Sequence, residues 1–259
     1  MSEPIKFKVE NQIARVTFNR PDQHNAISYE GWLRLIEIVN KIEEESSIRS
    51  VIFSGEGEKA FSAGADIKDF ETHRKDSATA RTYSTAFDGA LDAIEALSVP
   101  TISMIRGICV GGGCELSMAT DIRIASNKSR FGIPVAKLGI LVGYREMKRL
   151  VNLVVPGNAS YILLSGRLID SSEAFRMGLI TQLVDDSMLE DTVLNLATEI
   201  TPLAPLSQKR HKMILQNVIS KQSLEGLDPE LPFTNFDSAD FQEGKDAFIS
   251  RRPPNFQGI

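Results

Sequence analysis

Cysteine and histidine are scarce in this chain, which has two cysteines and three histidines among its 259 residues. Cys109 and Cys114 are too few to build a disulfide framework in a chain of this length. His24, His73 and His211 are far apart in the sequence and show no spacing typical of a metal site. We therefore expect reduced thiols, no bound metal and a cytoplasmic location.

Long apolar runs and a strong charge of either sign are also missing. No stretch approaches the roughly 20 apolar residues that span a bilayer. We expect no signal peptide, because residues 1–4 lack a charged region followed by an apolar one. The formal net charge is −5, so the overall charge gives no reason to expect nucleic acid. We expect neither a membrane nor a nucleic acid among the partners. The hydrophobic content of 42% supports a sizeable core.

Short strands and helices alternate along the first 200 residues. Alternating apolar residues over 5–10 and 13–18 predict a β-hairpin, and Ser28 is predicted to cap a helix that ends near residue 45. A long helix fits residues 77–97, after a polar segment over 69–76 that we expect to be mobile. Helices alone follow residue 200. This pattern indicates an α/β main body with a helical C-terminal segment.

A glycine-rich stretch over residues 106–117 is predicted to be the turn between a strand and a helix. Its glycines let backbone N–H groups face a ligand, and the helix that follows favours negative charge at its start. Glu115 lies in the first turn of that helix. The spacing does not fit the glycine patterns of dinucleotide-binding or P-loop proteins. The stretch fits an oxyanion site beside an acid/base group, or equally a tight structural turn.

A second loop of small residues, Ala63-Gly64-Ala65-Asp66, also follows a predicted strand. Taken alone it fits a capped turn better than a site. Two such loops could each offer one backbone N–H to the same carbonyl oxygen, which would make an oxyanion hole. A serine-hydrolase elbow is absent, and Cys114 fits a small buried side chain better than a nucleophile.

Several short motifs together carry a resemblance to a known family. They are residues 18–21 (Phe-Asn-Arg-Pro), 25–26, 60–68, Gly107, 111–116, 121–122, 131–134 (Phe-Gly-Ile-Pro), 137–139 and 243–248. In this order and spacing they resemble the crotonase (enoyl-CoA hydratase/isomerase) superfamily over essentially the whole chain. The resemblance implies an enzyme that binds an acyl-CoA thioester and stabilises its enolate.

The fold implied by this resemblance is α/β, a crotonase-like superhelix of repeated ββα turns. Residues 1–200 would form the acyl-CoA-binding core. Residues 201–259 would form a helical region that trimerises and covers the CoA site, giving a homotrimer or a dimer of trimers. No separate cofactor is implied, because coenzyme A is carried by the substrate.

The resemblance also implies roles for individual residues. The backbone N–H groups of Ala65 and Gly112 would hold the thioester oxygen, and Glu115 would be the acid/base. The implied substrate-binding residues are Ala63, Asp66, Ile67, Lys68, Val135, Tyr144, Arg145, Phe248 and Arg251. Ala63 would lie against the adenine end through its backbone, and Phe248 and Arg251 match positions that reach toward a neighbouring copy's CoA.

Two positions depart from the family's pattern. Hydratases of this family have a second glutamate after the Phe-Gly-x-Pro motif, where this chain has Val135. The usual Pro-Gly-Ala-Gly-Gly loop is replaced by residues 142–146, which include Tyr144, Arg145 and Glu146. These three residues either supply the missing group or only reshape the acyl pocket. A further hypothesis is that Arg145 favours acyl groups bearing a carboxylate, because a guanidinium pairs bidentately with a carboxylate.

The sequence therefore predicts an acyl-CoA enzyme, with enoyl-CoA hydration, a step of fatty-acid metabolism, as the first choice. One-glutamate relatives are the alternative within the superfamily, as an enoyl-CoA isomerase, a decarboxylase or an acyl-CoA hydrolase. A non-catalytic CoA-binding protein is the alternative from another class. The valine at position 135 favours these alternatives, and the retention of Glu115 with both small-residue loops counts against the non-catalytic one.

Overall fold

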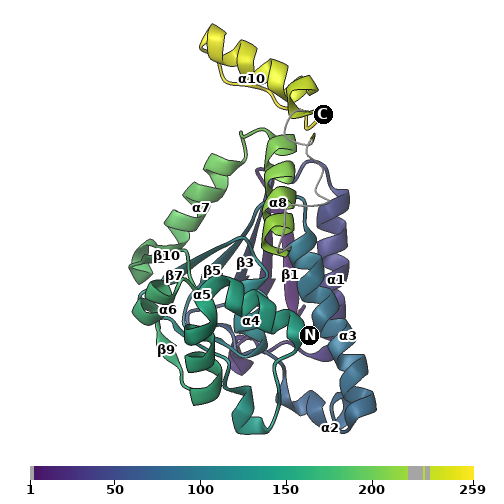
Figure 1. Cartoon of the computed structure of the whole chain (residues 1–259), viewed down its shortest axis with the longest axis vertical. Coiled ribbons are helices and arrows are strands. Elements are labelled where there is room, and N and C mark those ends of the chain that lie inside the picture. The colour runs from purple at the N-terminus through teal and green to yellow at the C-terminus, as the bar shows by residue number, and fades with distance from the viewer. Residues whose placement is uncertain (1–2, 221–229, 231–233) are drawn as a thin grey trace.

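The computed structural model describes residues 3–220, 230 and 234–259, and its described elements form two β-sheets with helices around them (Figure 1). The larger sheet has the order β1-β2-β3-β5-β7-β10, and the smaller has the order β4-β6-β8-β9. The strands of the larger sheet are β1 (Ile5–Glu10), β2 (Ile13–Phe18), β3 (Ser50–Gly55), β5 (Thr101–Ile105), β7 (Ile122–Ser126) and β10 (Gln182–Val184). Those of the smaller sheet are β4 (Ala60–Ser62), β6 (Ile108–Val110), β8 (Arg130–Gly132) and β9 (Ile169–Asp170).

Strands that follow one another along the chain form pairs, and each pair contributes one strand to the larger sheet and one to the smaller sheet. β3 and β4, β5 and β6, and β7 and β8 each follow this rule, and within each sheet these strands pair in parallel. Only the pairs β1/β2 and β8/β9 are antiparallel among the described strands. Helices follow the pairs, with α3 (Ser77–Ala96) after β4, α4 (Gly112–Met118) after β6 and α5 (Tyr144–Ser165) after β8. The predicted repetition of ββα units is confirmed.

The central strands β3, β5 and β7 of the larger sheet are buried on both faces, whereas the edge strand β1 is largely exposed. One face packs with α1 (Tyr29–Glu44), α3 and α4 into the main core, through Ala14, Val16, Phe18, Val51, Phe53, Ile105 and Ala125. The other face meets α7 (Leu189–Ile200) through Ile13, Ile52, Ile102 and Ile124.

The local predictions hold for the hairpin and for both long helices. The Ser28 hydroxyl accepts the Gly31 N–H at 3.2 Å and caps α1, as predicted. The polar segment over 69–76 is largely helical, with η2 (Ile67–Asp69) and α2 (Phe70–His73), which was not predicted. Contacts from α1 order it, because the Asp69 carboxylate accepts the Tyr29 N–H at 2.6 Å and His73 stacks on the Tyr29 ring.

The helices after residue 200 are α8 (Pro205–Ser220) and α10 (Ala239–Ser250), with a 3₁₀ turn before the latter. Figure 1 shows α10 set apart from the sheets, at the opposite end of the molecule from α2. Most of the predicted polar stretch over 220–235 lies outside the described residues. Within the described part of the chain, no helix has the length and apolarity needed to cross a bilayer.

Candidate active site

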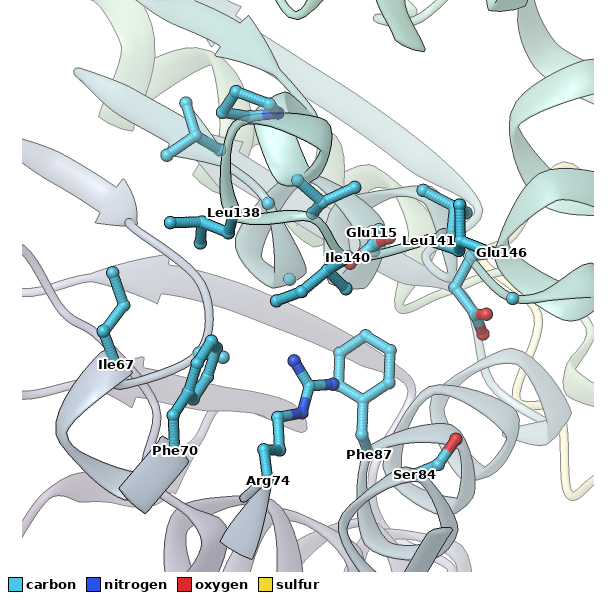
Figure 2. Close-up of a pocket in the computed structure, with 18 of the residues that line it drawn as sticks. Ile67, Phe70, Arg74, Ser84, Phe87, Glu115, Leu138, Ile140, Leu141 and Glu146 are labelled. Atoms are coloured by element: carbon cyan, nitrogen blue, oxygen red, sulfur yellow. The ribbon is translucent and has the colours of Figure 1, made fainter. Parts of the chain in front are cut away.

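A cavity of about 360 Å3 lies where the two glycine-containing loops meet. Its lining comes from the loop after β4, from α2 and α3, from the start of α4, and from the segment joining β8 to α5. Figure 2 shows Ile67 and Phe70 at one end and Ser84 and Glu146 at the other, with Arg74 and Phe87 between them. Ala65, Gly112 and Glu115, which the sequence predicts to act together, all line this cavity.

The two loops touch through their backbones. Gly64 has φ +87°, and a Cβ added there would lie 2.6 Å from the Gly112 nitrogen and 2.8 Å from the Val110 carbonyl oxygen. A Cβ added to Gly112 would lie 3.4 Å from the Ala65 nitrogen. Glycine is therefore required at position 64 for both conformation and space.

The N–H groups of Ala65 and Gly112 take no part in the backbone hydrogen bonds that their neighbours form. Ile27 donates its N–H to the Gly64 carbonyl at 2.8 Å, and Asp66 donates to the Ile27 carbonyl at 2.9 Å. In such a parallel bridge the N–H of the middle residue, Ala65, points to the other side. Gly112 is the first residue of α4, so its N–H has no partner within the helix. Both donors can therefore serve one oxygen atom in the cavity.

Glu115 is almost fully buried, at 6% exposure. Burial, the largest cause, and the charge of Glu146 together raise the pKa of its carboxyl to about 8. Arg74 lowers the pKa of Glu115, and Arg149 lowers it more weakly. Asp88 raises this pKa slightly. At neutral pH Glu115 therefore holds its proton, which suits a group that gives a proton to carbon.

Glu146 is a second buried carboxyl in the same cavity, at 4% exposure. It lies in the first turn of α5 and bends back over the start of the helix, since a Cβ on Gly143 would lie 2.5 Å from its Oε2 atom. Burial raises its pKa, its own backbone N–H lowers it, and the neighbouring Asp88 carboxyl raises it. Arg149 donates to its Oε1 atom at 3.5 Å.

Arg74 is the cation of this cavity. Its guanidinium lies 4.1 Å from the centre of the Tyr83 ring and 5.1 Å from that of Phe70, a geometry that favours a cation over an aromatic face. Figure 2 shows it extending toward Ile140 and Glu115. The sequence prediction did not include Ser84 or Asp88. Ser84 and Asp88 are polar residues four apart on the mostly apolar inner face of α3, a pattern that could have indicated them.

The implied substrate-binding residues after β4 divide into two groups. Ala63 and Ile67 line the cavity. Asp66 does not, because its carboxylate is held by Arg20 at 2.7 Å and accepts the Lys68 N–H at 3.1 Å. Burial alone would raise the pKa of Asp66, but these bonds outweigh it and the pKa is lowered. Lys68 is exposed and is not part of the lining either.

The remaining implied residues lie in three places. Val135 is half-buried and lines the cavity. Tyr144 is 97% exposed, and Arg145 forms an ion pair with Asp92; neither belongs to the lining. Phe248, at 86% exposure, and Arg251 belong to the end of α10, at the far end of the molecule from α2 (Figure 1).

Both cysteines are buried and free. Cys109 packs behind α4, where burial holds the pKa of its thiol well above the usual range. Cys114 is fully buried in the main core, as expected for a small apolar side chain. No cluster of three metal-binding side chains occurs among the residues that the structure describes.

The sequence model described as "Enoyl-CoA hydratase/isomerase" matches residues 8–258. The chain belongs to this family. It is 33% identical over 249 residues to the short-chain-enoyl-CoA hydratase of Clostridium acetobutylicum, covering 94% of this chain and 93% of the relative. It is 31% identical over 256 residues to the crotonyl-CoA hydratase of Syntrophomonas wolfei, covering 98% of each.

Solved structures of the enoyl-CoA hydratase/isomerase family have the same fold. A crystal structure described as an enoyl-CoA hydratase/carnithine racemase from Magnetospirillum magneticum matches with a TM-score of 0.96 and 34% identity. The match covers 100% of this chain and 97% of that one. The predicted crotonase fold is confirmed, and the enzyme is of the acyl-CoA-processing type that defines the family.

Proposed function

We propose that this enzyme hydrates an enoyl-CoA, with an oxyanion hole formed by the N–H groups of Ala65 and Gly112. The observation that carries the proposal is the meeting of these two donors and the Glu115 carboxyl in one cavity. The names of the two relatives above, both hydratases of short enoyl-CoA substrates, support a short acyl chain.

The chemistry follows from the charge that develops on the thioester. When water adds to Cβ of an α,β-unsaturated thioester, the thioester oxygen becomes an enolate oxygen. Two backbone donors aimed at that oxygen stabilise the enolate, and removing one such donor typically costs about 10²–10³ in kcat. Glu115, protonated at neutral pH because its pKa is about 8, then gives its proton to Cα.

Crotonyl-CoA in D₂O tests the proposal directly. Loss of the ultraviolet absorbance of the conjugated thioester reports hydration, and deuterium in the product reports where protons are exchanged. Glu115→Gln should abolish both signals. Deuterium at Cα or Cγ without loss of absorbance would instead indicate an isomerase or a related enolate enzyme. CoA binding with neither signal, over several acyl chains, would indicate a non-catalytic protein.

The complete substrate site is proposed to include a neighbouring copy of the chain, in a homotrimer or a dimer of trimers. The exposure of Phe248 and Arg251 and the position of α10 at the opposite end of the molecule from α2 support this (Figure 1). Arg251→Ala should raise KM for the acyl-CoA with little change in kcat. The buried free thiols of Cys109 and Cys114 support a reducing, cytoplasmic location. We propose no cofactor beyond the CoA of the substrate.

A further inference from the structure

Hydration moves two protons, and Glu115 accounts for only one of them. A water molecule must lose a proton as its oxygen attacks Cβ, and Cα must gain one. A single carboxyl that does both must begin as a carboxylate, take the proton from water and pass it to Cα. Glu115 holds its proton at neutral pH, so a second acid/base group in the cavity would take the proton from water.

The structure offers a second carboxyl at this place. Val135, which lines the cavity, cannot move a proton. Glu146 lines the same cavity, is buried, and lies close enough for its charge to act on Glu115. It comes from α5, whereas Glu115 comes from α4, so the two carboxyls approach the cavity from different elements.

The surroundings of Glu146 fit a carboxyl that gains and loses a proton during a reaction. Arg149 and the start of α5 favour its carboxylate, and burial and Asp88 favour its protonated form. The neighbouring Asp88 carboxyl raises the pKa of Glu146, and Asp88 accepts the Ser84 hydroxyl at 2.9 Å. Ser84 and Asp88, both on α3, therefore place polar groups in the same cavity as the Glu146 carboxyl. A purely structural anion would be expected to have its charge fully compensated, as Asp66 has through Arg20.

We propose that Glu146 is the second acid/base of the reaction and removes the proton from the attacking water. The Glu146 carboxylate takes that proton, and the water oxygen uses its freed electron pair to bond Cβ. The π electrons of the double bond move to form the enolate, whose oxygen Ala65 and Gly112 hold. Protonated Glu115 then gives its proton to Cα as the enolate collapses. The product is the 3-hydroxyacyl-CoA, and the proton passes from Glu146 back to Glu115 through solvent.

The inference rests on the proposed function, and two measurements on each variant separate them. The first is hydration of crotonyl-CoA. The second is exchange of the Cα protons of butyryl-CoA with D₂O, which needs Glu115 and the oxyanion donors but no attack by water. Glu146→Gln should lower kcat for hydration at least 100-fold and leave Cα exchange within 3-fold of the wild-type rate. Glu115→Gln should abolish both.

The matched control is Glu95→Gln. Glu95 also binds Arg149, at 2.7 Å, but lies outside the cavity and is half-exposed. Its variant should keep both activities near the wild-type level. Retained hydration in Glu146→Gln would overturn the proposal, and so would an equal loss of hydration and exchange, which indicates a structural role. If the wild-type protein shows neither activity, the proposed function itself is wrong and this inference is wrong with it.

Discussion

Gly64 lies so close to Gly112 that a single added methyl group would fall 2.6 Å from the Gly112 nitrogen. The contact joins the loop after β4 to the start of α4, the two segments that carry the proposed oxyanion donors. Both nearest atoms belong to the backbone and cannot rotate away. The relative position of the two donors therefore depends on the absence of a side chain at position 64.

Gly64→Ala should consequently lower kcat for enoyl-CoA hydration by about 100-fold or more, because the donors are forced apart. It should also destabilise the fold, since an alanine at φ +87° is strained. Gly157→Ala is the matched control, because a Cβ at Gly157 meets nothing within 4 Å. Steady-state hydration kinetics compare the two. Near-normal activity in Gly64→Ala would show that the two loops do not act on one oxygen.

The sequence predicted this site where local signals were strong. Glycines at loop positions, a carboxylate in a first helical turn and Ser28 as a cap are features of neighbouring residues, and all were found in the expected elements. Repeated short strands and helices likewise predicted the fold class. The strands β4, β6 and β9 of the smaller sheet were missed, because two or three residues carry too little periodicity to be recognised.

The rest of the site depends on contacts between distant residues. The segment 142–146 gave three candidates for the missing group, and nothing local distinguished them. In the structure Asp92, on α3, binds Arg145 outside the cavity, whereas Glu146 turns inward one residue later on the same helix. Since adjacent helical residues point in directions about 100° apart, the register of α5 against α3 decides which side chain enters. That register is set by tertiary packing.

Glu115 should make stability depend on pH. Its pKa is raised from 4.5 to about 8, so the proton it holds stabilises the folded state below the unfolded pKa, and this stabilisation is lost as the pH rises through 8. Between pH 5 and pH 8 the loss should be on the order of 3 kcal/mol. Glu115→Gln, which stays neutral, should gain that much in unfolding free energy relative to wild type over this range. Urea unfolding at both pH values measures the gain, and parallel curves for the two proteins would contradict the assigned pKa.

Arg74 should set the pH at which activity falls. It lowers the pKa of Glu115, so Arg74→Met should raise that pKa and move the alkaline limb of the kcat/KM profile to higher pH. The limb is descending because Glu115 must be protonated to give its proton to Cα. Arg81→Met, at an exposed position on α3, removes the same charge away from the cavity and should leave the limb in place. A limb that moves to lower pH in Arg74→Met would contradict the arrangement of charges.

Val155 has a strained backbone conformation, and it does not line the cavity described above. It has φ 60° and ψ 160°, a region that β-branched residues avoid, and it kinks α5 just before Pro156. Its side chain is 60% exposed, so little burial is lost by removing it. Val155→Gly should therefore stabilise the protein by about 1 kcal/mol, the relief of strain being partly offset by glycine's greater freedom in the unfolded chain. Val155→Ala keeps a Cβ and should gain less than half as much. Denaturant midpoints at one protein concentration compare the stability of the three proteins. Equal gains in stability for the two variants would show that the gain comes from removing the valine side chain and not from relief of backbone strain.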